Sequence, residues 1–269
     1  CIRDSANTTG ADNTAVGYLA LKANTCGSRN VAVGVQTLHA NTTGYSNTAI
    51  GPYALHDNTT AYRNTAVGNH ALTTYNPSSN EDGYNTAVGY AALDVTSTGN
   101  KNTALGSDAG NANTTGCRNT AVGMQAMYDN TSGQRNTALG MNAMFNNETG
   151  CYNTASGYGA LYSNTTGGSN TASGVKSLYS NTTASNNTAY GACALFANTT
   201  GANNTAIGGA ALCVNTSGDQ NTAIGNYALR ATTTGDYNTS TGYGALKTNT
   251  TASYNNAFGR GALLSLIHI

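Results

Sequence analysis

Side chains able to bind a metal ion or to catalyse a reaction are sparse in this chain of 269 residues, of which charged residues make up 8%. His39 and His56 are separated by 17 residues, and Asp57 follows the second His directly. Imidazole and carboxylate groups are suitable ligands for a divalent metal. The other aspartate at an equivalent spacing, Asp94, comes too far along the chain to complete a site. We therefore expect two solvated His side chains and no metal.

Acidic side chains and thiols are equally scattered. Acid–base catalysis requires two such groups held close together, and only Asp219 and Asp236 share the 17-residue spacing. The six Cys residues contain no CxxC pair and no Cys/His cluster with the spacing of a zinc site. We expect no enzymatic activity and no cofactor, and we expect the Cys residues to fill small surface sites.

The 17-residue spacing runs through the whole sequence. Each copy opens with an Asn, which occurs at Asn13, Asn30, Asn47, Asn64, Asn85, Asn102, Asn119, Asn136, Asn153, Asn170, Asn187, Asn204, Asn221, Asn238 and Asn255. Successive copies are 17 residues apart, except where 85 − 64 = 21. Fifteen copies in register indicate a repeat array rather than a globular domain. We number the repeat from this Asn, position 0, to position 16.

The residue types at fixed positions predict the shape of one repeat. Position 4 is Gly in all fifteen copies, which indicates positive φ or a close backbone approach after a first strand. Position 2 is Ala, and position 8 is Leu or Met, in fourteen copies each, which predicts a narrow interior. An Asn-Thr-Thr-Gly phrase supplies a second turn. Two short strands and two turns predict an all-β fold, a parallel β-solenoid (β-roll) of about 15 stacked 17-residue coils with Asn amide ladders.

The array is expected to form one domain over residues 1–263. Residues 4–12 match the second half of an earlier copy, which predicts that the sequence starts in mid-repeat. The repeat pattern stops after Leu263, and residues 264–269 are interpreted as a non-native tail.

Both faces of the first strand are apolar. Side chains alternate between the two faces of a strand, so Ala at position 2 fits the interior and the aliphatic column at position 3 faces outward. An apolar outer face requires cover, and identical chains packed around an axis would provide it. We therefore predict a homo-oligomer whose subunit interface includes Val16, Val33, Ile50, Val67, Val88, Leu105, Val122 and Leu139.

Five consecutive copies carry an aromatic residue at position 9, directly after the core Leu or Met. An outward stripe of apolar rings is typical of a contact surface. It also fits ring stacking within the array or packing on a sister chain, and these alternatives stay open. The candidate contact surface consists of Tyr128, Phe145, Tyr162, Tyr179 and Phe196.

Two copies depart from the pattern. Four extra residues fall around residues 75–83, where Pro77 cannot donate to a hydrogen-bond ladder, so we expect a loop outside the coils. Gly110 replaces the core Leu, and a cavity left there would cost about 2–5 kcal/mol if nothing filled it. We expect that copy to be locally weak.

The composition also excludes some partners. The net charge is zero, with 11 basic and 11 acidic residues, whereas nucleic acid would favour a basic stripe. No run of the sequence approaches the roughly 20 apolar residues of a membrane span. We expect neither nucleic acid nor a membrane span.

Several copies, for example residues 13–17, 47–51 and 221–225, read Asn-Thr-Ala-Val-Gly or Asn-Thr-Ala-Ile-Gly. They resemble the Ala-Ile/Val-Gly motif of the YadA-like heads of trimeric autotransporter adhesins, and similar repeats occur in phage tail-fibre-like proteins. The resemblance covers about residues 7–263. It implies a trimeric, left-handed β-roll that is extracellular, on a cell or virion surface. The repeat here is longer than that of the adhesin heads.

The sequence therefore favours a structural and adhesive surface fibre segment, either an adhesin head or a tail-fibre shaft, that presents a repetitive binding surface to a host surface or glycan. The alternative is an ice-binding β-solenoid, because Thr columns at positions 1, 12 and 13 could present a regular hydroxyl lattice. Against this alternative, two consecutive Thr in the second turn cannot both face outward on a flat strand.

Overall fold

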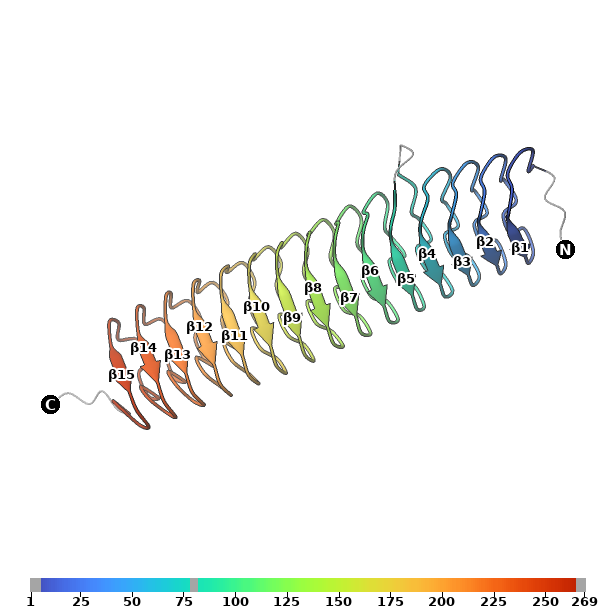
Figure 1. The fold of residues 1–269 in the computed structure, drawn as a ribbon. Coiled ribbons are helices and arrows are strands. Elements are labelled where there is room, and N and C mark those ends of the chain that lie inside the picture. The colour runs from blue at the N-terminus through green and yellow to red at the C-terminus, as the bar shows by residue number, and fades with distance from the viewer. Residues whose placement is uncertain (1–5, 78–81, 265–269) are drawn as a thin grey trace. The chain divides into compact units, whose positions relative to one another are not determined.

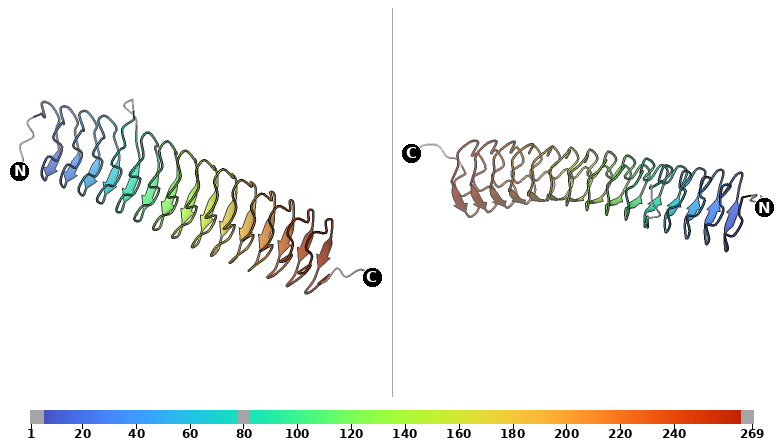
Figure 2. Two further views of the ribbon diagram at one scale, coloured as in Figure 1. Left: turned by 180° about the vertical axis from the view of Figure 1, so that it is seen from behind. Right: turned by 90° about the horizontal axis from the view of Figure 1, so that it is seen from above.

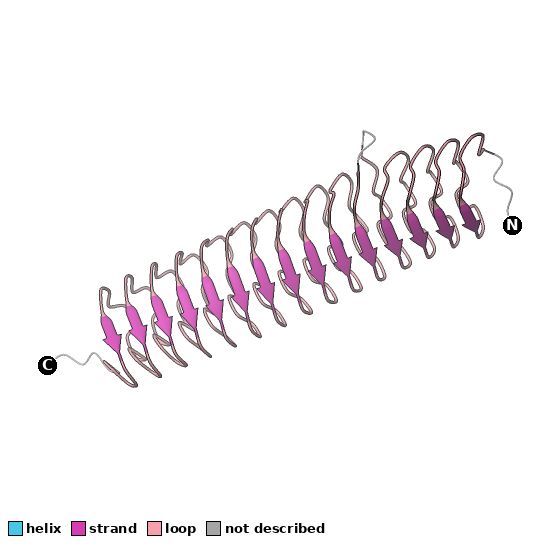
Figure 3. Cartoon of the chain, viewed as in Figure 1, coloured by secondary structure: helices cyan, strands magenta, loops and turns pink. Residues whose placement is uncertain are grey.

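The structure of the chain is a computed structural model, and it describes residues 6–77 and 82–264. The described residues form fifteen three-residue strands joined by turns, so the fold is all-β (Figure 1, Figure 3). The chain divides into two compact units, unit 1 (Cys1–Arg135) and unit 2 (Asn136–Ile269). Glu81 of the insertion and residues 265–269 of the predicted tail lie outside the described residues.

Each unit contains a single series of short strands. The strands of unit 1 are β1 (Thr14–Val16), β2 (Val31–Val33), β3 (Thr48–Ile50), β4 (Thr65–Val67), β5 (Thr86–Val88), β6 (Thr103–Leu105) and β7 (Thr120–Val122). The strands of unit 2 are β8 (Thr137–Leu139), β9 (Thr154–Ser156), β10 (Thr171–Ser173), β11 (Thr188–Tyr190), β12 (Thr205–Ile207), β13 (Thr222–Ile224), β14 (Thr239–Thr241) and β15 (Asn256–Phe258).

Within each unit, every strand pairs in parallel with the next strand along the chain. In unit 1, Ala15 lies opposite Ala32, and in unit 2, Ala155 lies opposite Ala172. The partners are one repeat apart, so each strand and the segment that returns to the next strand make one coil (Figure 2). The predicted parallel β-solenoid with 17-residue coils is confirmed.

The Gly at position 4 ends each strand for two physical reasons. Gly34 has a φ of +140°, which side chains with a Cβ rarely adopt. A Cβ on Gly17 would also lie 2.2 Å from the carbonyl oxygen of Gly34 in the next coil. Both predicted causes, positive φ and close backbone approach, are therefore present.

The return side of the coil, positions 5–10, is not the second strand that the sequence predicted. Leu38 at position 8 has a φ of +49° and Gln36 at position 6 a φ of +53°, both left-handed values. Hydrogen bonds still link the coils, since Leu21 N donates to Thr37 O at 3.0 Å and Gln36 N donates to Tyr18 O at 2.8 Å. A left-handed conformation costs a Leu about 1–2 kcal/mol, and burying its side chain returns about 1.5–3 kcal/mol. Burial therefore offsets the strain.

The interior is narrow, as predicted. The Ala residues at positions 2 and 7, such as Ala49 and Ala54, and the Leu at position 8, such as Leu55, are fully buried. The predicted amide ladders are also present. Asn30 Nδ2 donates to Asn13 Oδ1 at 3.2 Å, and Asn41 Nδ2 donates to Asn24 Oδ1 at 2.8 Å. Thus Asn at positions 0 and 11 stack in two columns inside the array.

The two Asn columns converge on one backbone carbonyl in the coils that have Asn at position 11, which Tyr75, Thr96 and Thr232 replace in three coils. Asn30 Nδ2 donates to Gly44 O at 2.8 Å, and Asn41 Nδ2 donates to the same oxygen at 3.0 Å. A buried amide left without an acceptor would be costly. The shared carbonyl therefore holds the chain in the path that leads from the turn back into the strand.

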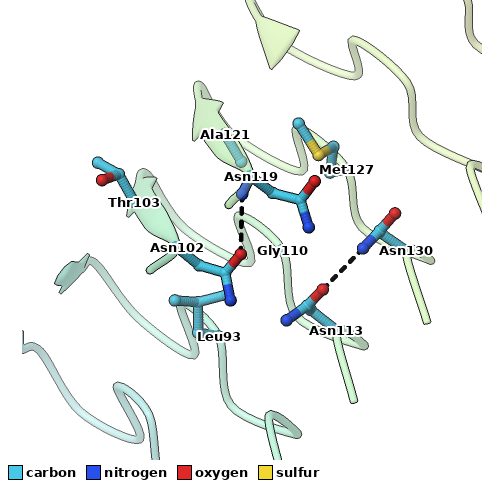
Figure 4. A pocket seen from close by; sticks show the side chains of 9 residues that line it. All are labelled: Leu93, Asn102, Thr103, Gly110, Asn113, Asn119, Ala121, Met127 and Asn130. Atoms are coloured by element: carbon cyan, nitrogen blue, oxygen red, sulfur yellow. Dashed lines mark hydrogen bonds between the residues drawn. The ribbon is translucent and has the colours of Figure 1, made fainter. Parts of the chain in front are cut away.

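Gly110 leaves a cavity in unit 1, as predicted, but a small one (Figure 4). Its volume is about 10 Å³, at the lower limit for one water molecule. The cavity is lined by Leu93, Asn102, Thr103, Gly110, Asn113, Asn119, Ala121, Met127 and Asn130. Leu93 fills part of the space, because its Cδ2 atom lies 2.9 Å from the place that a Cβ on Gly110 would occupy.

Candidate binding surfaces

The side chains at position 3 point outward from the strands, opposite the buried Ala at position 2. Val16 is 56% exposed and Leu105 is 48% exposed, whereas Ala104 beside it is fully buried. Among the other residues of the predicted subunit interface, Ile50 and Leu139 are exposed and the rest are partly exposed, namely Val33, Val67, Val88 and Val122. Tyr190, which is 61% exposed, continues the column in unit 2. This column is apolar surface that the chain itself does not cover.

A second exposed apolar column lies at position 5, just beyond the strand-ending Gly. The sequence analysis did not identify it, although the same sorting by repeat position finds it. Its large exposed members are Tyr18, Val35, Tyr90, Met124, Met141, Tyr158, Val175 and Tyr243. We call positions 3 and 5 together the apolar band. Repeated exposed apolar side chains of this kind indicate contacts with another molecule.

The strand face that carries position 3 also carries a column of Thr at position 1. Thr occupies this position in thirteen of the fifteen strands. In unit 2 the residues stack in register, with Thr171 opposite Thr188 and Thr205 opposite Thr222. In strands such as β3 and β12, a Thr hydroxyl at position 1 and an aliphatic side chain at position 3 therefore lie on the same outer face.

The aromatic column at position 9 forms a ladder of parallel rings in unit 2. Successive ring centroids are 5.1, 5.0 and 5.3 Å apart from Phe145 through Tyr162 and Tyr179 to Phe196, with interplanar angles of 9–12°. Tyr128, the fifth residue of the predicted contact surface, belongs to unit 1. The inner rings have a neighbour on each face, so a ligand would meet ring edges and Tyr hydroxyls rather than ring faces.

The two His residues stack as their spacing predicts. The rings of His39 and His56 are 5.0 Å apart and parallel within 2°, and His56 Nδ1 lies 2.6 Å from Asp57 Oδ1. Burial, assisted by His56 and Lys22, lowers the pKa of His39. The described residues contain no group of three or more His, Cys, Asp or Glu side chains that could hold a metal ion. The described cysteines form no disulfide, namely Cys26, Cys117, Cys151, Cys193 and Cys213.

Beside the insertion lies a cluster that the sequence analysis missed. The Arg63 guanidinium pairs with Asp82 and donates to the Tyr84 hydroxyl at 2.8 Å. It also lies over the rings of Tyr45 and Tyr62, which stack on each other at 4.4 Å. A cation above aromatic rings is attracted to them, so this cluster holds the inserted segment against the coil. The Tyr residues at position 15 of adjacent copies were the available sequence signal.

Comparison with protein-family models, with curated proteins and with solved structures finds no match to this chain. The described residues also include no helix with the length and apolarity needed to cross a membrane. The surfaces described above are therefore the basis for any functional assignment.

Proposed function

We propose that this chain is a structural and adhesive fibre segment that assembles as a homo-oligomer, a trimer, on a cell or virion surface. It would act without catalysis and present repeated side-chain columns to a host surface or glycan. The resemblance of its Asn-Thr-Ala-Val/Ile-Gly copies to YadA-like adhesin heads and to phage tail-fibre repeats supports this proposal.

The observation that carries the proposal is the uncovered apolar band. Val16, Leu105 and Tyr190 are all about half exposed or more on a strand face that repeats coil after coil. Burial of apolar surface contributes about 25 cal/mol per Å², so a repeated column gains with every coil that a partner covers. An identical chain has the same repeat, which makes it a suitable cover over the full length of each unit.

The test is the molar mass of the full chain, measured by light scattering after size exclusion. We expect three times the chain mass of 27.3 kDa. Replacing the exposed Ile207 by Arg should place a charge in the interface and reduce the mass toward that of one chain. The matched control is Thr200→Arg in an exposed turn, which should leave the mass unchanged. A wild-type monomer would contradict the proposal.

The Thr column supports a second candidate function, binding to ice. The position 1 hydroxyls form a regular array on one outer face, with Thr171 opposite Thr188 as an example. Adjacent parallel strands are about 4.8 Å apart, which gives the array a fixed spacing. Thermal hysteresis in the purified protein would favour this candidate, and its absence would remove it.

A further inference from the structure

The outward column at position 9 changes from rings to cations toward the end of unit 2. After Phe196, the next three coils carry Cys213, Arg230 and Lys247 at this position. Arg230 is exposed and Lys247 is partly exposed. Stacked coils place equivalent residues about 4.8 Å apart, so two positive side chains start from neighbouring points of the surface.

Both cations lie against the same aromatic ring. Arg230 Cζ and Lys247 Nζ are each 5.6 Å from the centroid of the Tyr227 ring. The ring attracts each cation, and it thereby holds two like charges close together. Like charges at short range repel each other, so an anion placed between them lowers the electrostatic energy of the site.

No carboxylate among the described residues neutralises this pair, because neither cation forms an ion pair with any of them. The acids of residues 204–264 are Asp219 and Asp236, both at position 15, in the turn before the next strand. Asp219 Oδ1 accepts from Ala202 N at 2.6 Å, and Asp236 Oδ1 accepts from Asp219 N at 2.8 Å. The two positive charges are therefore available to an anion from outside the chain.

Arg230 and Lys247 line an open hollow of about 290 Å³. Its other lining residues occupy position 10 of three successive coils, and they are Val214, Ala231 and Thr248. The volume is about ten times the roughly 30 Å³ that one water molecule occupies in the liquid, and it is close to the lower limit of small-molecule sites. The hollow therefore has room for a ring-sized body as well as an anionic group.

The backbone amides of the hollow are already paired. Val214 N donates to Arg230 O at 3.3 Å, and Ala231 N donates to Lys247 O at 3.1 Å. Anion recognition therefore depends on side chains, and guanidinium and ammonium groups form strong hydrogen bonds to anionic oxygens. The methyl groups of Val214 and Ala231 add a small apolar surface for the C–H groups of a ligand.

We propose that this hollow binds the anionic group of an acidic sugar, a sulfate, phosphate or carboxylate carried on a sugar ring. Arg230 and Lys247 hold the anionic group, and the ring lies against Val214 and Ala231. The inference deepens the proposed function. The choice of a sugar as the carrier rests on that function, whereas the anion site rests on the geometry alone.

The cations form a local site rather than a stripe. A nucleic acid requires a row of cations along its phosphate backbone. Position 9 has Cys213 before Arg230 and Leu264 after Lys247, so the positive charge in this column ends after two coils. A single anionic group fits this arrangement better than a polyanion does.

Titration of the full chain, followed by ligand-observed NMR, tests the site. The probes are glucose 6-sulfate, glucose 6-phosphate and glucuronate, which share a sugar ring and differ in the anionic group. Glucose and inorganic sulfate each lack one of the two parts. We expect at least one charged sugar to bind about tenfold more tightly than glucose, and more tightly than inorganic sulfate.

Two lysines of unit 2 provide matched variants. Lys247→Gln should weaken binding of the charged sugar about tenfold. Lys176 is also partly exposed, and its Nζ atom also lies 5.6 Å from a Tyr ring centroid, that of Tyr179, but it is the only cation of residues 153–203. Lys176→Gln should therefore leave binding unchanged. Lys247→Arg keeps the charge and should retain most of the binding.

Each contrary outcome overturns a stated part of the inference. Equal effects of Lys247→Gln and Lys176→Gln would remove the site, as would the absence of binding by all three charged sugars. Glucose binding as tightly as the charged sugars would overturn the role of the anion. Inorganic sulfate binding as tightly as glucose 6-sulfate would overturn the role of the sugar.

The molar mass from light scattering keeps this inference separate from the proposed function. A trimer that binds none of the charged sugars would overturn the site and leave the fibre in place. A monomer that binds a charged sugar through Lys247 would contradict the fibre and leave the anion site in place.

Discussion

At the scale of single residues, the Asn columns show how one side chain sets the order of a whole coil. Asn215 Nδ2 donates to Asn198 Oδ1 at 2.8 Å and to Gly218 O at 3.0 Å, but its own Oδ1 is buried and has no hydrogen-bond partner. The reason is that position 11 of the next coil is Thr232 instead of Asn. An orphaned acceptor of this kind costs about 1–3 kcal/mol.

Thr232→Asn should therefore stabilise the protein. The new amide would donate to Asn215 Oδ1 and to Gly235 O, as Asn does in the neighbouring coils, and would replace the single bond from Thr232 Oγ1 to Asn249 O. We expect a gain of about 1 kcal/mol in the free energy of unfolding, measured by denaturant titration. The control Thr234→Asn lies in an exposed part of the same turn and should change stability by less than about 0.5 kcal/mol. Equal effects of the two variants would contradict the role of the orphaned acceptor.

Gly110→Leu tests the cavity in unit 1. The φ of Gly110 is +59°, close to the +53° of Leu93 at the same position of the preceding coil, so the backbone already suits a Leu. The new side chain would require Leu93 to withdraw its Cδ2 atom from the space that it fills. We expect a net gain of about 1 kcal/mol, the burial of the added Leu less its left-handed strain. Slower hydrogen exchange over residues 102–118 than in the wild type would report the gain locally, and faster exchange would indicate overpacking.

At the scale of the element, the sequence predicts the strand and its end but not the return side. Ala32 and Gly34 keep one residue type in nearly every copy, because only a small side chain fits the interior and only Gly fits the turn. Leu38 keeps its type too, but an apolar residue among small ones is compatible with either a strand or a turn. Its left-handed φ is set by the neighbouring coils, whose hydrogen bonds are not visible in one repeat. The predicted second strand was wrong for that reason.

Two adjacent glycines in unit 2 differ in whether the structure requires Gly. Gly208 lies where a Cβ would be strained and would clash, whereas Gly209 lies where a Cβ would fit. Gly208 at position 4 has a φ of +131°, and a Cβ there would lie 2.6 Å from the carbonyl carbon of Gly225. On Gly209 the nearest atom would be Asn226 Oδ1 at 3.4 Å, an ordinary contact. Gly208→Ala should lower the free energy of unfolding by at least about 3 kcal/mol, whereas Gly209→Ala should change it by less than about 1 kcal/mol. Thermal and denaturant unfolding of both variants would measure this, and similar losses would contradict the assignment.

Contacts between coils, which are not visible in one repeat, also limited what the sequence could predict about the candidate surfaces. The column at position 3 follows from the alternation along a strand and the column at position 9 from the 17-residue spacing, so sequence reasoning found both. The Arg63 cluster escaped, because Asp82 and Tyr84 reach it only through the insertion, which breaks the 17-residue spacing. Its geometry depends on contacts between coils that no single repeat contains.

At the scale of the whole molecule, the response to salt distinguishes assembly through the apolar band from assembly through charge pairs. Apolar burial along the band is insensitive to screening, whereas charge pairs act over a Debye length that falls from about 30 Å at 0.01 M to about 3 Å at 1 M ionic strength. Charge complementarity mainly raises association rates and selects register, while buried apolar area holds the complex together. Because the apolar band carries the proposed assembly, we expect the molar mass to stay constant as salt rises. A mass that decreases with salt would mean that charge pairs, rather than the apolar band, hold the copies together.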